Sequence, residues 1–223
     1  MESLRSVTGI AAAMLVINID TDQIIPARYM GGPDATGYGR MLFANQRFLG
    51  DDRTPDPAFV LNQPPYDQAS ILLADRNFGC GSSRERAPKA LREFGFRAII
   101  APSYGGIFFN NCFRNGIVPV ELPIDSVRQI ADEVAASSGR AAVTVDLEAQ
   151  QVRTAGGLVF AFESPAALRT MLLEGLDEIG LTLSRGPRID AFRQVDRLRR
   201  PWAYSPGTDT PGAALASAEE ARP

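Results

Sequence analysis

Short apolar segments recur along the chain and alternate with longer amphipathic ones. Small and branched apolar residues make up the runs 70–74, 98–101 and 117–120, each of strand length. Between them lie two segments of helical composition, 84–94 and 107–114. Short apolar strands that alternate with helices are typical of a parallel sheet with helices on its faces. The centre of the chain is therefore predicted to be an α/β sheet.

The segments on either side of this centre continue the pattern. The apolar run 12–19 is branched enough for a buried strand, and the polar residues 18–22 are expected to follow it as a turn. Two glycine- or proline-rich segments, 31–39 and 51–65, are expected to be irregular, the first of them a mobile loop. Beyond the centre we expect a helix over 124–136, a β-hairpin of 142–147 and 151–154, a strand over 158–162, and a helix over 165–173 that stops at Gly175.

The end of the chain has a different composition. Ile189, Phe192, Val195 and Leu198 recur on one face of the segment 188–200, which predicts an amphipathic helix. From residue 201 onward, proline, glycine, alanine and serine dominate, as is typical of disordered segments. We therefore predict one three-layer α/β domain over residues 1–200, with a C-terminal helical extension, and a disordered tail over residues 201–223.

Size and charge exclude several classes of protein. A chain of 223 residues is long enough for one sizeable core, and its net charge of −3 argues against a nucleic-acid binder. The longest N-terminal apolar run, 10–19, is interrupted by Asn18 and is too short to span a bilayer, and the N-terminus does not resemble a signal peptide. A cytoplasmic protein without membrane contact is the expectation.

Histidine is absent from the sequence, and the only cysteines are Cys80 and Cys112. The absence of histidine removes the commonest general base and excludes Ser–His and Cys–His nucleophile pairs within this chain. Two thiols alone do not supply the four ligands that iron–sulfur clusters usually take, so no metal or cofactor is expected in this chain. Acid–base chemistry must use a carboxylate, a hydroxyl or a group from a partner.

Candidate chemistry is concentrated in the loop 77–86, which joins a predicted buried strand to a predicted helix. Backbone N–H groups at a helix N-terminus are unpaired, and the helix dipole makes such an end attractive to anions. Gly79 and Gly81 allow the backbone to approach a ligand, and two serine hydroxyls follow. Arg84 adds a planar fork that suits a carboxylate. In open α/β sheets, ligands bind at the carboxyl ends of the strands, where this loop lies.

The loop matches none of the common glycine-rich motifs. Gly79-x-Gly81 begins like a dinucleotide fingerprint, but Arg84 occupies the position of the third glycine. A phosphate-binding loop would need a lysine directly before Ser or Thr, and the sole lysine, Lys89, lies elsewhere. Two interpretations stay open at this point: an anion site, or a serine that merely caps the helix, with Glu85 near the capping-box position.

Three separated segments resemble the small-subunit family of 3-isopropylmalate dehydratases. They are 18–26 (NIDTDQIIP), 77–85 (NFGCGSSRE) and 100–111 (IAPSYGGIFFNN), and 175–183 (GLDEIGLTL) is similar to the family's C-terminal signature. The resemblance runs from about Thr8 to Arg185 and keeps the motifs in order. It implies a three-layer swivelling β/β/α domain of the aconitase small-subunit type.

The resemblance assigns roles by position. Ser82 is similar to the serine alkoxide base that removes a proton next to a carboxylate, and Ser83 and Arg84 are similar to groups that hold a substrate carboxylate. Asp22 is similar to an acidic residue that lines the same cleft, and Thr21 belongs to its loop and is counted with the substrate-binding residues. A serine base needs a nearby cation, which Arg84 supplies.

The resemblance also implies a partner. In this family a separate large subunit holds a [4Fe-4S] cluster whose open iron binds the substrate hydroxyl and a carboxylate, and the small subunit closes over it. The expected function is the interconversion of 2-isopropylmalate and 3-isopropylmalate by dehydration and rehydration in leucine biosynthesis. A hydro-lyase active only with its large subunit, acting on a small dicarboxylic acid, is therefore expected.

Some positions depart from the family pattern. The family commonly has His-Ala-Pro-Trp where this chain has Arg86-Ala87-Pro88-Lys89, and often an arginine where it has Ala35. These departures leave open a related 2-alkylmalate hydro-lyase, for example one for methylmalate or citraconate, and a non-catalytic module that binds a partner. Arg28 follows Pro26 at the mouth of the loop that contains Asp22. Two interpretations of Arg28 stay open, a contact with substrate and a solvated position.

Other candidate groups have plainer interpretations. Cys80 is expected to fill a small pocket beside the loop rather than act as a nucleophile, and Cys112 to lie in the core. Asp20 and Asp22 lack further metal ligands nearby and are expected to form a turn. The arginines within 193–200 are expected on an exposed helix face or at a subunit contact.

Overall fold

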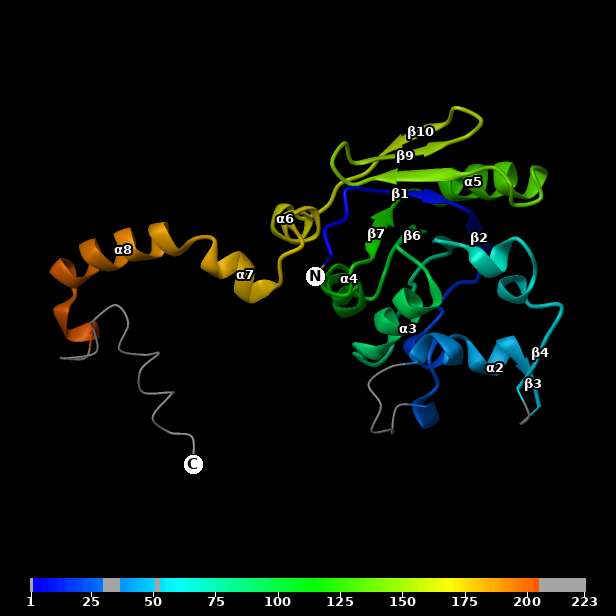
Figure 1. The fold of residues 1–223 in the computed structure, drawn as a ribbon, viewed down its shortest axis with the longest axis horizontal. Helices are drawn as coiled ribbons and strands as arrows, with labels where there is room; N and C mark the ends of the chain where they lie inside the picture. Colours follow the sequence, from blue (N-terminus) through cyan, green and yellow to red (C-terminus); the bar gives the residue numbers. More distant parts are fainter. Residues whose placement is uncertain (1, 30–36, 51–52, 205–223) are drawn as a thin grey trace. The chain divides into compact units, whose positions relative to one another are not determined.

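The computed structural model describes residues 2–29, 37–50 and 53–204. By its contacts the chain divides into two units, residues 1–177 and residues 178–223, which are described separately. The first unit contains the sheets and the candidate site (Figure 1).

A parallel sheet forms the centre of the first unit. It contains β2 (Ala11–Met14), β5 (Ile71–Ala74), β6 (Ala98–Ala101) and β7 (Val118–Glu121), in the order β2-β5-β6-β7. All three neighbouring pairs are parallel, and every residue of β5 and β6 is buried. The prediction of a parallel sheet from these apolar runs is confirmed.

Alternation along the strands assigns the helices to opposite faces of this sheet, because successive side chains of a strand point to opposite sides. On one face, Leu72 and Ile99 share a core with α3 (Arg86–Phe94) and with much of α4 (Gly106–Arg114). On the other face, Ile71 and Ile100 share a core with α5 (Ile124–Ala136).

A second, antiparallel sheet lies on the α5 side. It contains β1 (Ser6–Gly9), β8 (Val143–Asp146), β9 (Gln151–Thr154) and β10 (Val159–Ala161), in the order β1-β8-β9-β10. The buried valines of β8 and β9 belong to the same core as α5 and the parallel sheet. Figure 1 shows this sheet beside α5. The unit therefore has three layers: α3 with α4, the parallel sheet, and α5 with the antiparallel sheet. The predicted fold class is confirmed.

The prediction of one strand over 12–19 is wrong. Only residues 12–14 of this run belong to a strand, because β2 ends at Met14. Val16 and Ile17 are 55% and 50% exposed, and Asn18 has a left-handed φ of 58°, which an extended strand does not allow. Apolar composition was therefore a poor guide to where the strand ended.

Short elements connect β2 to β5. The elements are α1 (Thr21–Ile24), η1 (Ala27–Tyr29), η2 (Tyr38–Met41), α2 (Ala44–Arg47), β3 (Phe48–Leu49), β4 (Thr54–Pro55), η3 (Val60–Asn62) and η4 (Tyr66–Gln68). In its described part, residues 53–65, the predicted irregular segment contains the brief strand β4 and the 3-10 helix η3, and the predicted loop 31–39 falls largely outside the described residues.

The last helix of the first unit is α6 (Ala166–Glu174), which ends at Gly175 with φ 69°, as predicted for a left-handed C-cap. The second unit contains α7 (Glu178–Leu183), α8 (Gly186–Arg199) and η5 (Pro201–Ala203). The predicted tail beyond residue 204 lies outside the described residues. Among the residues described, no helix is long and apolar enough to cross a membrane.

Candidate functional site

Loops from three parts of the chain meet at the carboxyl edge of the parallel sheet. The segment 77–85 follows β5, and the turn 102–105 follows β6. Isolated β-bridges join Phe78 to Tyr104 and Asp20 to Cys80, which brings in the segment after β2. Carboxyl ends of neighbouring parallel strands lie at one edge, so this convergence follows from the topology.

Thr21 fastens the segment after β2 to the serine-containing loop. Its backbone N–H donates to the carbonyl of Cys80 at 3.0 Å, and its hydroxyl donates to the carbonyl of Ser82 at 2.8 Å. A third bond, from Gly79 N to the carbonyl of Ile19, measures 2.7 Å. Thr21 is only 2% exposed. Its hydroxyl therefore positions the loop, although the sequence placed Thr21 among the substrate-binding residues.

Asp20 begins α1 with a capping box. Its carboxylate accepts from the backbone N–H of Gln23 at 2.7 Å, and the Gln23 side chain accepts from the backbone N–H of Asp20 at 3.0 Å. The cap fixes the start of α1, and the β-bridge between Asp20 and Cys80 places it beside the loop. Within the described residues, no group of three or more His, Cys, Asp or Glu side chains could hold a metal ion.

The turn after β6 approaches the loop very closely. A Cβ atom on Gly105 would lie 2.5 Å from the carbonyl oxygen of Gly79, and one on Gly79 would lie 2.2 Å from the ring of Phe108. Gly79 also has φ 70°, which favours glycine. The close approach encloses a cavity of about 190 Å³, lined by residues 79–84 and 105–108.

Three side chains with reactive or charged groups lie near the end of the loop, those of Ser82, Ser83 and Arg84. Ser82 and Ser83 are exposed, and the Arg84 side chain, 16% exposed, forms an ion pair with the half-exposed carboxylate of Asp22. The interpretation of a serine helix cap is wrong, since α3 begins at Arg86 and its N-cap is Glu85, which makes no side-chain cap bond. Ser82, Ser83 and Arg84 all line the cavity.

Arg28 lies apart from this group. Its Nη2 donates to Oδ1 of Asn45 at 2.6 Å, and its guanidinium carbon lies 4.6 Å from the centre of the Tyr29 ring. These contacts hold the exposed Arg28 side chain against Tyr29 and α2. The structure thus brings Ser82, Ser83, Arg84 and Asp22 together and does not join Arg28 to them.

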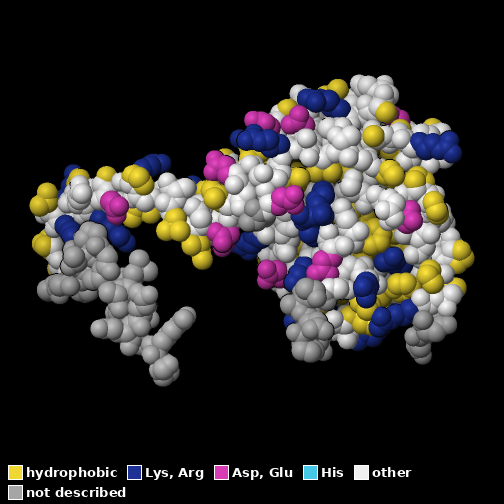
Figure 2. All heavy atoms as spheres, in the orientation of Figure 1, with side chains coloured by type: hydrophobic (Ala, Val, Ile, Leu, Met, Phe, Trp, Pro, Cys, Tyr) yellow, Lys and Arg dark blue, Asp and Glu magenta, His cyan; other side chains and the backbone are white. Residues whose placement is uncertain are grey.

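The residues that depart from the family pattern lie on α3. The Arg86 guanidinium carbon and the Lys89 Nζ lie 5.7 and 5.3 Å from the centre of the Tyr38 ring. Tyr38 opens η2, which packs against α3. Figure 2 shows Lys and Arg side chains gathered over the region of α2 and α3. Ala35 falls outside the described residues.

No role was predicted for Tyr104, which packs against Phe78 of the serine-containing loop. Its hydroxyl lies 2.7 Å from the carbonyl oxygen of Ile99 and 3.0 Å from that of Val120, so its one proton is shared between two acceptors, and its ring meets the Phe78 ring edge to face. Burial raises the pKa of Tyr104 well above its ordinary value, so the hydroxyl stays protonated and can donate. A signal for this role was present in the sequence, because Tyr104 belongs to the family-like segment 100–111 and directly precedes two glycines.

The two cysteines differ in environment. Cys112 is fully buried in the core, as predicted, and burial raises the pKa of its thiol well above its ordinary value. Cys80 is partly exposed and lines the cavity. Its backbone carbonyl, rather than its thiol, makes the bond that organises the loop.

Comparison with known proteins matches this geometry to a family. The model of the aconitase C-terminal domain matches residues 1–125, and the LeuD_N model matches residues 128–163. The 3-isopropylmalate dehydratase small subunit of Cupriavidus necator is 54% identical over 208 residues, which are 93% of this chain and all of that protein. The chain belongs to the family of 3-isopropylmalate dehydratase small subunits.

Other members of the small-subunit family agree with this assignment. The small subunit of Agrobacterium fabrum (strain C58) is 46% identical over 203 residues, covering 91% of this chain and all of that protein. The crystal structure of 3-isopropylmalate dehydratase (leuD) from Methanocaldococcus jannaschii superposes with a TM-score of 0.58 at 23% identity. It covers 84% of this chain and 99% of the other, so it shows a shared fold.

Proposed function

We propose that this chain is the small subunit of a 3-isopropylmalate dehydratase and interconverts 2-isopropylmalate and 3-isopropylmalate together with a large subunit. The proposal is carried by one observation: Ser82 and Arg84 lie on the same loop at a cavity formed at the carboxyl edge of the sheet. The names of its relatives support the choice of reaction and substrate.

Ser82 is proposed as the base that removes the proton from the substrate carbon next to a carboxylate. A serine hydroxyl is a weak base unless its alkoxide form is stabilised by nearby positive charge. Arg84, two residues away, supplies that charge at the same cavity. In the reverse direction the Ser82 hydroxyl returns the proton to carbon.

Arg84 and Ser83 are proposed to bind a substrate carboxylate. The Arg84 guanidinium is already directed by its ion pair with Asp22, so little reorientation is needed when substrate enters. Asp22 is proposed to keep Arg84 in position through this ion pair. A carboxylate on the opposite side of the guanidinium would complete a charge-assisted pair.

The remaining chemistry is assigned to the large subunit. Cys112 is buried in the core and Cys80 lies in the loop, so the thiols of this chain do not form the ligand set of an iron–sulfur cluster. We propose that a [4Fe-4S] cluster on the large subunit supplies the Lewis acid for departure of the substrate hydroxyl. This chain contributes the base and the carboxylate site, and it is proposed to act in the cytoplasm.

Reconstitution tests this assignment. The purified chain should be colourless and inactive, and anaerobic mixing with its cluster-bearing large subunit should produce turnover of isopropylmalate. Isopropylmalate should have a higher kcat/KM than methylmalate or a bulky aryl-substituted malate. A preference of more than tenfold for either alternative would reject the substrate, and activity of the chain alone would reject the two-subunit enzyme.

Replacement of Ser82 tests the base. General-base catalysis commonly contributes about 10²–10⁴-fold in rate, so Ser82→Ala should lower kcat by that order with little change in KM. Ser83→Ala, a matched change at the next residue, should mainly raise KM. If Ser82→Ala kept a near-normal kcat in an assembled complex, Ser82 would not be the base.

A further inference from the structure

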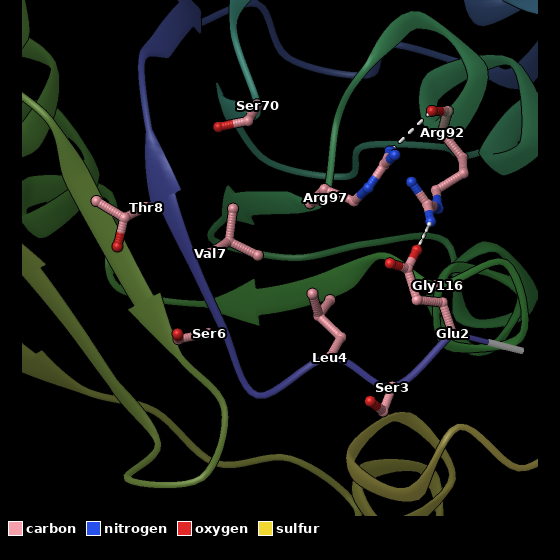
Figure 3. A pocket seen from close by; sticks show the side chains of 10 residues that line it. All are labelled: Glu2, Ser3, Leu4, Ser6, Val7, Thr8, Ser70, Arg92, Arg97 and Gly116. Carbon is pink, nitrogen blue, oxygen red and sulfur yellow. Dashed lines mark hydrogen bonds and ion pairs between the residues drawn. The ribbon is translucent and has the colours of Figure 1, made fainter.

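A second cavity lies at the amino edge of the parallel sheet. It is lined by Ser70, Arg97 and Gly116, which come just before β5, β6 and β7, and by Arg92 of α3 and Glu2. Its volume is about 280 Å³ (Figure 3). The candidate active site is at the carboxyl edge of the same strands, so the two sites are separate.

Two arginines stand at one end of this cavity. Arg97 Nη1 donates to the carbonyls of Arg92 at 2.9 Å and Phe96 at 3.1 Å, which fixes the guanidinium at the end of α3. The Arg92 side chain packs over Gly116, and a Cβ atom on this glycine would lie 3.2 Å from Nε of Arg92. In Figure 3 both guanidinium groups lie on the same side of the cavity. Two cations that line one cavity favour the binding of an anion there.

The charges lining the cavity are not balanced. Glu2 is the one carboxylate among the lining residues, and it accepts from Arg92 at 3.2 Å with a side chain that is 82% exposed. Exposed pairs of this kind contribute little to stability, so an incoming anion can replace Glu2. One positive charge among these described lining residues therefore has no carboxylate counterpart.

A buried hydroxyl lines the same cavity. Ser70 Oγ is buried and makes no hydrogen bond to any described residue. Its oxygen is closed off from solvent, and in Figure 3 it points away from Arg92 and Arg97. Ser70 therefore forms part of the cavity wall and is not counted among the groups that would hold an anion.

We propose that this cavity binds a small oxyanion with two negative charges, either phosphate or a dicarboxylate, between Arg92 and Arg97. The guanidinium forks suit oxyanions, and a dianion would neutralise both cations once Glu2 has moved away. The inference is independent of the proposed reaction, because none of these residues belongs to the cavity around Ser82.

Calorimetric titration of the full chain tests the proposal, with inorganic phosphate in one arm and malate in the other at constant ionic strength. Saturable binding is expected in at least one arm, and the arms decide which anion is preferred. Arg92→Gln should weaken binding about tenfold or more, since hydrogen bonds to charged groups are strong. Glu2→Gln should strengthen it, because the competing carboxylate is gone.

Matched variants separate this cavity from other sites. Arg128→Gln removes the same charge from the exposed surface of α5 and should leave binding unchanged. Arg97→Lys keeps the positive charge, so this variant should still fold, and it should bind the anion more weakly than wild type because the guanidinium fork is lost. The proposal fails if neither anion saturates, if Arg92→Gln binds like wild type, if Glu2→Gln weakens binding, or if Arg84→Gln abolishes it.

Discussion

The hydroxyl of Thr21 donates a 2.8 Å hydrogen bond to the backbone carbonyl of Ser82, which is 61 positions away in the sequence. This bond and the Thr21 N–H bond to Cys80 fix the backbone of the serine-containing loop from one buried residue. The proposed base thus takes its position from a neighbouring segment rather than from the helix that follows it.

Thr21→Val should lower kcat by about ten- to a hundredfold, with a smaller change in KM. Valine keeps the shape of threonine but cannot donate to the Ser82 carbonyl, and small displacements of a catalytic group are costly. Steady-state kinetics of the reconstituted complex would measure this. Thr144→Val, which removes a hydroxyl bonded to Thr8 in the antiparallel sheet, is the matched control. A kcat within twofold of wild type in Thr21→Val would contradict the positioning role.

Arg84→Lys should lower kcat/KM by about ten- to a hundredfold for all alkylmalates alike. Lysine keeps the charge but loses the planar fork, and a charge-assisted hydrogen bond is worth roughly 1.5–3 kcal/mol. The neighbouring change Arg86→Lys should have little effect, because it retains a cation over the Tyr38 ring. Kinetics with isopropylmalate and methylmalate would show whether the loss is uniform. A loss confined to one substrate would instead make Arg84 a determinant of side-chain specificity.

Gly105→Ala should destabilise the chain by about 1–3 kcal/mol, because the new methyl group would meet the Gly79 carbonyl at 2.5 Å. Gly106→Ala is a matched control at the next residue, where a Cβ atom has nothing within 4 Å. Alanine at this first residue of α4 should leave stability equal or slightly higher. Chemical denaturation of both variants gives the comparison. Equal stability would show that the turn relaxes without cost.

Iodoacetamide should modify Cys80 in the native chain and leave Cys112 intact. Thiolates are the reactive form, and burial both shields Cys112 and raises its thiol pKa well above its ordinary value. Mass spectrometry would locate the adduct, with Cys80→Ser as the unreactive control. The modified chain should lose activity on reconstitution, since the adduct enters the cavity around Ser82. Fast modification of Cys112 without unfolding would contradict the buried environment.

Several strand and helix positions followed from local pattern. The strand 98–101 and the helix 124–136 were predicted with the bounds that the structure has. The prediction of a strand over 12–19 failed because its apolar residues have different environments. Ala12 is fully buried in the core that contains α3, whereas Val16 and Ile17 lie at the surface. An apolar run does not state which of its residues pair with a neighbouring strand, and here the pairing of β2 with β5 stops at Met14.

For the site, the sequence alone pointed to the loop, its glycines, its serines and Arg84, because the loop follows a buried strand and resembles the family's motif. Only the tertiary structure decided their neighbours. It showed that Thr21 holds the loop, that Asp22 pairs with Arg84 and that Arg28 donates to Asn45. The physical reason is that hydrogen bonds and ion pairs depend on distances between segments, and those distances are set when the parallel strands align their carboxyl ends.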